Sequence, residues 1–420
     1  MRILLLTPYF FPYRNPRAYR WTAIARAWVQ LGWEVHVVCS RSPDWPKEGV
    51  WEGIHLHRTG FNSVKELAYY FFRKMPQRGE TLHLKPSPWP RRLNDWLLKP
   101  WYWPDDAWLW LPAAQKKSIQ LLGKGQWDAL ISVSLPFSAH WIAQKLKRRF
   151  PKLHWIVDVG DPFSLQTRHP LNNALLYHRK NRKAERLVLE TADGITVTNE
   201  GLAEAYGKQF PLLQTPVQVI SPMSSSLPPI HIPWKNPARP LQFGYFGSFF
   251  RHIRKPEPML FFFERLRSSM TYWELHIYGA IFEEFWPAFD RFPELKQHLV
   301  FHPVLPREEV LSEMQEMDVL VMLGNTTSFQ LPSKWADYLI AGRPVLHLMQ
   351  TPADPAMPMV GNEEYVLSIP WDEENTKIRL ETFLEHARDW EISGEVVGKW
   401  SRRFSAMAIS EEYGRLIQEI

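Results

Sequence analysis

The sequence predicts an α/β protein with two domains, each built on a parallel sheet. Its 420 residues exceed what one ordinary hydrophobic core requires. Short apolar runs alternate with helical patterns along the chain, as expected for βαβ units whose strands are buried on both faces. Residues 221–240 are rich in proline and lack a periodic pattern, so the boundary between the two domains is expected there.

The composition is that of a globular protein without cysteine-based cross-links. The apolar fraction of 45% is ordinary for a globular protein, and the net charge of +6 is modest. The single cysteine, Cys39, rules out a disulfide within the chain and any zinc cluster made of cysteines. It also suits a reducing compartment.

The sequence indicates a cytoplasmic protein. Residues 1–7 form a short apolar run that ends at Pro8, which is typical of a first strand rather than of a secretory leader. No apolar run approaches the roughly 20 residues that span a bilayer.

The chain opens with a strand, a loop, a helix and a second strand. RILLLT is the first buried strand. From Arg17 to Leu31, apolar residues recur every three or four positions, which predicts an amphipathic helix. WEVHVVCS is the second strand. The loop lacks the glycines of dinucleotide-binding folds. Its bases Arg14, Arg17 and Arg20 either reach a ligand or form a solvated helix start.

Residues 61–126 stand apart from this alternation. Between Lys65 and Lys99 there are eight bases and three acids, and aromatic residues are interleaved with them. Such a segment suits the surface of an anionic membrane. Alternatively, it packs on its own domain and leaves a solvated basic face. The usual motifs of nucleic-acid binders are absent, so we expect no nucleic-acid partner.

The alternation resumes after this insertion and brings two aspartates to the end of a strand. Residues 126–134 and HWIVDV are predicted strands, and helices follow them. Asp158 and Asp161 lie at or beyond the carboxyl end of the second strand, where ligands meet parallel sheets. Asp161 is the better candidate for contacting hydroxyls of a ligand, because Asp158 alternatively caps a neighbouring helix. His140 lies inside a predicted helix and is interpreted as structural.

In the second half of the chain the alternation of strands and helices begins again with the strand LQFGYF. The segment richest in candidate ligand-binding residues comes later in this half. The buried strand VLVML leads through a loop to a short helix, which is expected to begin with Ser333 as its N-cap. Gly342 and Pro344 end this helix. A helix start offers free N–H groups and a positive dipole end, which favour phosphate, and Lys334 adds a full charge. Asp337 shares the helix face and accepts hydrogen bonds from hydroxyls.

Phosphate beside hydroxyl-binding groups describes a nucleotide sugar. Three bases, Arg251, Arg254 and Lys255, follow the strand LQFGYF. Placed opposite Lys334, they form an anion clamp, although such a loop taken alone is usually solvated. The alternative interpretation is an ordinary βαβ unit with a surface lysine and aspartate.

The segment PSKWADYLIAGRPVL resembles the donor-site segment of family-4-like glycosyltransferases of the GT-B fold. The stretches LGWEVHVV, WDALISVSLPFS, DVGDPF and FGYFGS resemble other parts of that family, in the same order. The resemblance covers essentially the whole chain and is weakest over residues 61–126. It implies two Rossmann-like domains that face a cleft. Residues 1–222 would bind the acceptor, residues 241–395 would bind the donor, and residues 396–420 would form a helix that returns to the first domain.

The resemblance also implies roles for the residues at matching positions. The implied donor-binding residues are Gly247, Ser248, Arg254, Lys255, Gly279, Ser333, Lys334 and Asp337. The implied acceptor contacts are Arg17, Arg20 and Asp161, and the implied catalytic acids are Asp161 and Asp337. The nucleobase is expected near residues 302–305. The family retains the configuration of the transferred sugar and uses no bound cofactor and no essential metal.

One position departs from the pattern of the family. The family has two acids eight residues apart in the donor segment, and Asp337 fits the second of them. Phe329 stands where the first acid belongs.

These features together predict a hexosyltransferase-like enzyme. It would move a sugar from a UDP- or GDP-linked donor to a lipid-linked or polysaccharide acceptor, with retention, in cell-envelope or exopolysaccharide synthesis. Peripheral contact with the cytoplasmic face of the membrane would use residues 61–126. Two alternatives remain, a nucleotide-sugar epimerase of the same fold and a catalytically degenerate protein that binds sugar nucleotides. The second is favoured by Phe329 and by Ser134, which stands where many family members carry a histidine.

Overall fold

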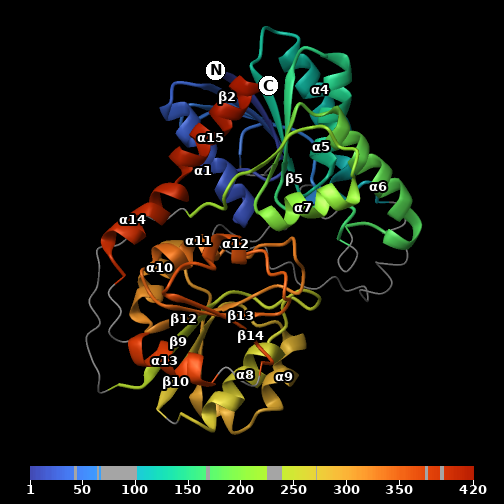
Figure 1. The fold of residues 1–420 in the computed structure, drawn as a ribbon. Coiled ribbons are helices and arrows are strands. Elements are labelled where there is room, and N and C mark those ends of the chain that lie inside the picture. The colour runs from blue at the N-terminus through green and yellow to red at the C-terminus, as the bar shows by residue number, and fades with distance from the viewer. Residues whose placement is uncertain are drawn as a thin grey trace. The chain divides into compact units, whose positions relative to one another are not determined.

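The chain forms two compact units (Figure 1). Unit 1 comprises Met1–Thr198, Tyr206–Ile220 and Ala406–Ile420, and unit 2 comprises Asn199–Ala205 and Ser221–Ser405. The computed structural model describes residues 1–41, 45–63, 66–67, 102–166, 171–224, 239–270, 272–373, 377–387 and 392–420. Most of the basic, aromatic insertion predicted at residues 61–126 and most of the proline-rich stretch therefore lie outside the described residues.

Unit 1 is built on an eight-stranded sheet in the order β3-β4-β2-β1-β5-β6-β7-β8. The strands are β1 (Arg2–Leu6), β2 (Glu34–Cys39), β3 (Glu48–Trp51), β4 (Ile54–Arg58), β5 (Ala129–Ser134), β6 (His154–Val159), β7 (Gly194–Val197) and β8 (Val217–Val219). All neighbours are parallel except β3 and β4, which form an antiparallel hairpin. The central strands are buried along nearly their whole length, because helices cover both faces of a parallel sheet.

Two of the helices of unit 1, the first and the longest, begin at a capping asparagine. The helices of this unit are α1 (Pro16–Gln30), α4 (Leu111–Leu122), α5 (Ser138–Arg149), α6 (Ala174–Thr191), α7 (Glu200–Gln209), which starts in the segment that clusters with unit 2, and α15 (Ala406–Glu419). A short 3-10 turn, η2 (Asp106–Leu109), precedes α4. The side chain of Asn15 accepts a hydrogen bond from the N–H of Ala18 at 2.8 Å and so caps α1. Helix α6 is capped by Asn173, whose side chain accepts a hydrogen bond from the N–H of Leu176 at 3.2 Å.

The C-terminal helix α15 packs in unit 1 against α1. The buried ring of Tyr413 lies 5.4 Å from that of Trp21 and 5.9 Å from that of Trp28, both of them on α1. The Tyr413 hydroxyl donates to Asp158 Oδ1 at 2.7 Å, at the end of β6. Burial and the Asp158 carboxylate raise the pKa of Tyr413, so the phenol stays protonated and remains a donor.

Unit 2 is built on a six-stranded, fully parallel sheet in the order β11-β10-β9-β12-β13-β14. The strands are β9 (Leu241–Phe246), β10 (Trp273–Tyr278), β11 (Leu299–His302), β12 (Val319–Leu323), β13 (Val345–Met349) and β14 (Val366–Pro370). The helices are α8 (Glu257–Arg267), α9 (Trp286–Asp290), α10 (Arg307–Glu316), α11 (Trp335–Ile340), α12 (Met357–Val360), α13 (Lys377–Ala387) and α14 (Gly394–Arg403). Short 3-10 turns precede α9 and β11, at Glu283–Phe285 and Leu295–His298.

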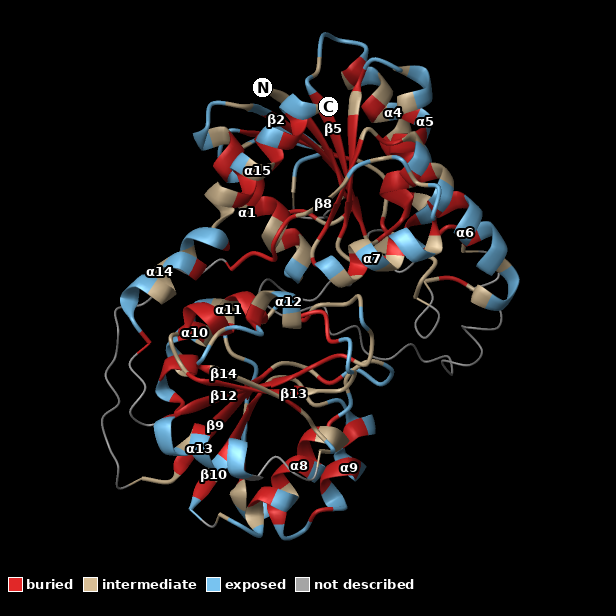
Figure 2. Ribbon diagram, in the orientation of Figure 1, coloured by how far each residue is buried: buried red, intermediate tan, exposed pale blue. Residues whose placement is uncertain are grey.

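The sheet of unit 2 separates two hydrophobic clusters. On β12, Val319 and Val321 belong to one cluster and Leu320 and Met322 to the other, because successive side chains of a strand point to opposite faces. The first cluster includes residues of α8, α9 and α13, and the second includes residues of α10, α11 and α14. Figure 2 shows the central strands of both units as mostly buried segments and the helices with exposed outer sides. The predicted two-domain α/β fold with parallel sheets is confirmed.

Candidate functional site

The predicted donor residues of unit 2 follow the carboxyl ends of its central strands. Gly247 and Ser248 come directly after β9, Gly279 comes directly after β10, and the segment that ends in Lys334 follows β12. In a parallel sheet these ends lie at the same edge, and β9 is hydrogen-bonded to both β10 and β12.

Two glycines at this edge meet backbone to backbone. The N–H of Gly247 donates to the carbonyl of Tyr278 at 3.0 Å. Gly279 has a φ of +145°, and a Cβ added there would lie 2.4 Å from the carbonyl oxygen of Gly247. Only glycine fits at position 279, because any side chain would both strain the backbone and displace the loop after β9.

The substitution Gly279→Ala should lower the free energy of unfolding by about 1–3 kcal/mol, the cost of a strained backbone conformation. The measurement is urea denaturation. Gly207→Ala is the matched control, because Gly207 lies in helix α7 and a Cβ there meets nothing within 4 Å. The control should be as stable as the parent or slightly more stable. Equal stability of the two variants would contradict the close approach at Gly279.

Arg254 places a positive charge in the tight loop between β9 and α8. Phe250 and Arg254 exchange two backbone hydrogen bonds, of 2.7 and 2.9 Å, and the Arg254 guanidinium lies 5.5 Å from the Phe250 ring centroid. The side chain is half-buried, and its Nε has no hydrogen-bond partner among the described residues. Its charge opposes the rise in the pKa of Tyr245 that burial causes. Arg251 and Lys255 are exposed by contrast.

The loop that holds Arg254 is joined to the loop that leads into α11. The N–H of Thr326 donates to the carbonyl of Ile253 at 2.8 Å, and Thr326 Oγ1 donates to the carbonyl of His252 at 3.2 Å. These bonds connect the bases after β9 to the segment after β12 that ends in Lys334. The structure thus brings both halves of the predicted anion clamp to one edge of the sheet.

Lys334 and Asp337 form an ion pair at the start of α11. Lys334 Nζ lies 3.0 Å from Asp337 Oδ2, and Ser224 Oγ donates to Asp337 Oδ1 at 2.8 Å. Both carboxylate oxygens of Asp337 therefore have partners, and the charge of Lys334 is partly compensated. Ser333 is exposed and is not the N-cap, as the sequence had suggested, because the N-cap position falls on Lys334 and no side chain caps the helix.

The role of Tyr338 was not predicted from the sequence. Its buried hydroxyl donates to the carbonyl of Val321 at 3.1 Å and accepts from the N–H of Phe246 at 2.9 Å. Helix α11 is thereby fixed to both β9 and β12, directly below the predicted donor residues. A tyrosine on the inner side of a short helix is the only signal in the sequence, and it is equally typical of core packing.

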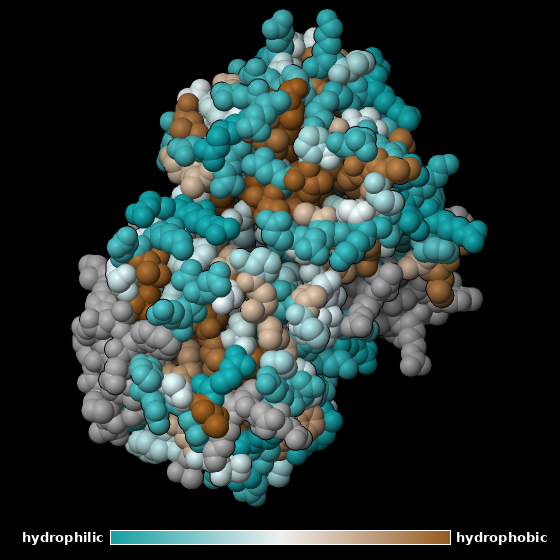
Figure 3. Space-filling view, in the orientation of Figure 1, coloured by the Kyte–Doolittle hydropathy of each residue, from teal (hydrophilic) through white to brown (hydrophobic). Residues whose placement is uncertain are grey.

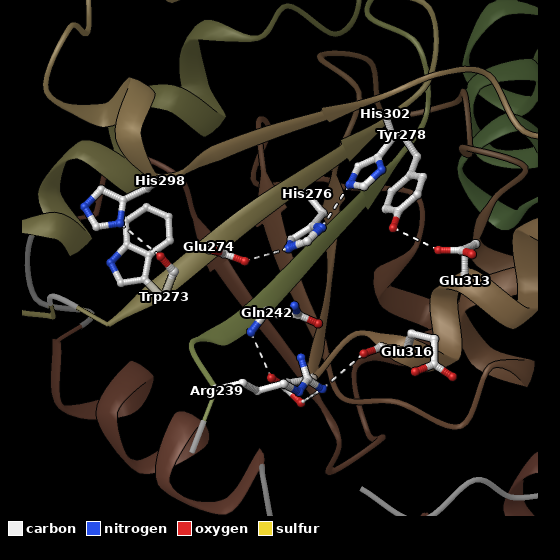
Figure 4. A network of polar contacts seen from close by, with 11 residues as sticks. Arg239, Gln242, Trp273, Glu274, His276, Tyr278, His298, His302, Glu313 and Glu316 are labelled. Atoms are coloured by element: carbon white, nitrogen blue, oxygen red, sulfur yellow. Dashed lines mark hydrogen bonds and ion pairs between the residues drawn. The ribbon is translucent and has the colours of Figure 1, made fainter. Parts of the chain in front are cut away.

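Three rings stack across the ends of β9, β10 and β11. The Tyr278 ring lies between those of Phe246, at 4.3 Å, and His302, at 4.0 Å, and in both pairs the ring planes are nearly parallel. Figure 4 shows the Tyr278 hydroxyl donating to Glu313 at 3.0 Å and the His302 ring bonded to His276. Burial lowers the pKa of His302, so its ring is neutral at pH 7. This stack borders residues 302–305, where the nucleobase remains a prediction.

In unit 1 the structure pairs two predicted acceptor residues with each other. Arg17 Nη2 lies 3.2 Å from Asp161 Oδ2, and Arg17 Nη1 donates to the carbonyl of Leu135 at 2.5 Å. The pair links α1 to the loops that follow β5 and β6. Arg20, the third predicted contact, lies half-buried on α1.

Asp158 and His140 have structural roles. Asp158 is buried and accepts hydrogen bonds from Thr196 Oγ1 at 2.9 Å and from Tyr413, so it does not cap a helix, as one alternative had proposed. His140 Nδ1 lies 2.7 Å from Ser132 Oγ, and complete burial lowers the pKa of His140 to about 3. A histidine that is neutral throughout the physiological range and closed off from water suits the structural interpretation.

One group of potential metal ligands occurs among the residues that the structure describes. Glu34, His36 and His55 have ligand atoms within 4.8 Å of one another. Glu34 is already engaged, because Arg2 Nε lies 3.0 Å away and His36 Nε2 lies 2.8 Å away. The Arg2 cation disfavours a second cation at this carboxylate.

A family model described as "Glycosyl transferase 4-like domain" matches residues 18–222. Residues 18–222 therefore belong to the glycosyl transferase 4-like family. Among curated protein sequences, none matches this chain.

Solved structures of similar fold cover the whole chain. A sucrose-phosphate synthase from Thermosynechococcus elongatus aligns with a TM-score of 0.65 and 14% identity, over 100% of this chain and 98% of that one. The Anabaena protein HepE, in complex with UDP and glucose, aligns with a TM-score of 0.62 and 12% identity over 100% of both chains. The lipopolysaccharide outer core galactosyltransferase WaaB, in its apo form, gives 0.59 and 14%, also over 100% of both chains. At these identities the likeness establishes the fold.

Proposed function

We propose that this glycosyltransferase transfers a sugar from a nucleoside-diphosphate donor to a hydroxyl of a lipid-linked or polysaccharide acceptor, with retention. The observation that carries the proposal is Arg254, a half-buried cation whose Nε has no hydrogen-bond partner among the described residues. Its loop is bonded to the segment that leads to Lys334. Fixed positive charge at one sheet edge is what a leaving nucleoside diphosphate requires.

Different residues of unit 2 would bind different parts of the donor. Arg254, Lys255 and Lys334 would stabilise the negative charge that develops on the diphosphate as the glycosidic bond breaks. The backbone of Gly247, which carries no side chain, would approach the diphosphate closely. Asp337 would accept hydrogen bonds from donor hydroxyls, and this requires the carboxylate to exchange Ser224 or Lys334 for the ligand.

The proposed donor nucleotide is UDP. HepE has been solved with UDP and glucose and with UDP-glucose, and it shares the fold of this chain. GDP is the alternative that the experiment below must distinguish. A role in the cell envelope is proposed by analogy with WaaB, a lipopolysaccharide outer core galactosyltransferase.

In unit 1 the proposed acceptor residues are Arg17, Arg20 and Asp161. The ion pair between Arg17 and Asp161 holds a carboxylate oxygen beside the ends of β5 and β6. A carboxylate in that place accepts a hydrogen bond from an acceptor hydroxyl and orients it. Asp161 is thus the proposed catalytic carboxylate of unit 1.

A second candidate function is binding of sugar nucleotides without turnover. It is favoured by Phe329, which is half-buried in the loop before α11 where the family has an acid. Release of UDP that depends on an added acceptor would separate a transferase from such a binder.

The first experiment is a thermal-shift screen of the full chain against UDP, GDP, ADP and their common sugar conjugates. A ligand that binds only the folded state raises the unfolding midpoint, so a selective shift names the nucleotide. Lys334→Ala should remove that shift, whereas Lys296→Ala should keep it, because Lys296 is an exposed lysine paired with Asp290. No shift with any nucleotide, or a shift that survives Lys334→Ala, would contradict the proposed site.

A further inference from the structure

Helix α6 presents an outward face that is both apolar and basic. Its inward stripe, formed by Asn181, Ala184, Glu185, Val188 and Leu189, is buried. The exposed side chains of the opposite side form what we call the α6 face: Leu175, Leu176, Arg179, Lys180, Arg182, Lys183 and Arg186. Figure 2 shows the outer side of α6 as exposed, and Figure 3 shows hydrophilic side chains along this edge of unit 1.

The leucines of the α6 face are unusually exposed. Leu175 is 95% exposed and Leu176 is 60% exposed, and no other large hydrophobic side chain in the described ranges reaches the exposure of Leu175. They stand side by side in the first turn of the helix. Neither leucine contributes to the core of unit 1. The transfer of their side chains to an apolar medium would therefore be favourable and would not disturb that core.

The charge of the α6 face is almost entirely positive. Glu185 points inward and is engaged by the N–H of Phe163 at 2.7 Å and by the hydroxyl of Tyr206 at 2.8 Å. Only Glu190, at the last turn, meets the basic side, where it pairs with Arg186 at 2.7 Å. The remaining bases follow the leucines along the helix at spacings of three and four residues, which places them on one side.

We propose that the α6 face docks on an anionic lipid bilayer. Leu175 and Leu176 enter the boundary between headgroups and acyl chains, and the bases that follow them contact the anionic headgroups. An amphipathic helix with apolar residues and Lys/Arg on adjoining surfaces is the arrangement that binds in the plane of a membrane. Nucleic acid would make favourable contacts with the basic side chains but not with the leucines, because its backbone offers phosphates rather than an apolar layer.

This inference extends the proposed function without depending on it. A lipid-linked acceptor lies in such a surface, and that connection rests on the proposed function. Docking itself needs neither donor nor acceptor. The sequence had suggested the basic, aromatic insertion at residues 61–126 for membrane contact, and the α6 face touches that insertion at one point, where Lys180 Nζ lies 3.7 Å from the ring centroid of Trp103.

The test is cosedimentation of the full chain, at low salt, with two kinds of vesicle. One contains equal parts of phosphatidylcholine and phosphatidylglycerol, and the other contains phosphatidylcholine alone. Binding is expected to the anionic vesicles only. The single variant Leu175→Glu and the double variant Arg179→Glu/Lys183→Glu should each bind them about tenfold more weakly or worse, since each base near an anionic surface contributes measurably. All replaced side chains are exposed, so the variants should fold, and an unchanged unfolding midpoint checks this.

Matched controls make the test specific to α6. Leu212→Glu replaces a leucine of unit 1 that is 72% exposed, and Arg402→Glu/Arg415→Glu reverses two exposed helix bases elsewhere. Both controls should bind like the parent.

Three results would overturn the proposal. In the first, the α6 variants bind the vesicles as well as the parent does. This includes the case in which the insertion variant Arg91→Glu/Arg92→Glu no longer binds them. In the second, the double variant weakens binding to vesicles and to a DNA duplex alike, while Leu175→Glu changes neither. In the third, the parent fails to bind anionic vesicles at all. A nucleotide shift retained in the α6 variants would leave the proposed transfer intact in every case.

Discussion

Replacing Arg254 by alanine should lower kcat/KM for sugar transfer by about a hundredfold or more, the loss typical of a fixed group that stabilises developing charge. The guanidinium is half-buried beside the ends of β9 and β12, and its Nε has no hydrogen-bond partner among the described residues. A cation held there before the donor arrives needs no reorganisation when the diphosphate leaves. The measurement is the initial rate of nucleoside-diphosphate release with the donor that the thermal-shift screen identifies.

The stability of the same variant provides an independent check. Removing a half-buried cation also removes the cost of its desolvation, so the ligand-free midpoint of Arg254→Ala should be unchanged or higher. Arg254→Lys should recover only part of the rate, because an ammonium lacks the planar fork of guanidinium. Arg251→Ala is the control, and its exposed side chain should matter little. If Arg251→Ala loses activity and Arg254→Ala keeps it, the assignment of the clamp is wrong.

Replacing Tyr413 by alanine should destabilise unit 1 by about 3–5 kcal/mol, the usual cost of removing a buried aromatic ring. The ring packs between Trp21 and Trp28, and its hydroxyl bonds to the buried carboxylate of Asp158. The two tryptophans lie next to the lost ring, so fluorescence during urea denaturation reports the change directly.

Two further variants separate packing from hydrogen bonding at this position. Tyr413→Phe keeps the ring and leaves Asp158 bonded to Thr196, so the expected cost is smaller, about 1–3 kcal/mol. Tyr272→Ala removes a tyrosine that is 56% exposed and should cost little. Equal losses for Tyr413→Phe and Tyr413→Ala would show that the hydroxyl, and not the packing of the ring, holds α15 on unit 1.

The sequence was most informative where a local pattern determines structure. Buried strands such as VLVML could be predicted, and so could the helix expected from Arg17, which begins at Pro16, because apolar periodicity acts over a few residues. The hairpin of β3 and β4 was passed over, although Glu52 and Gly53, which have φ values of 49° and 79°, form the kind of two-residue turn that joins such strands.

The contacts that define the site could not be predicted in the same way. Arg17 meets Asp161 because β5 lies next to both β1 and β6, and alternation of strands and helices does not determine strand order. The anchoring of α11 by Tyr338 and the joining of two loops through Thr326 likewise depend on which strands are neighbours. The sequence thus placed residues at the correct edge of a sheet, and the pairing among them required the fold.

Unit 1 is assembled from the beginning and the very end of the chain, and this determines the order in which the protein can fold during synthesis. The ribosome releases α15 only after every residue of unit 2 has been made. Unit 2 can therefore fold while unit 1 still waits for the helix that covers Trp21 and Trp28. Until then the nascent chain carries an open aromatic surface, which is a natural place for a chaperone to bind. Chains that terminate before residue 406 should contain a folded unit 2 attached to a unit 1 that aggregates.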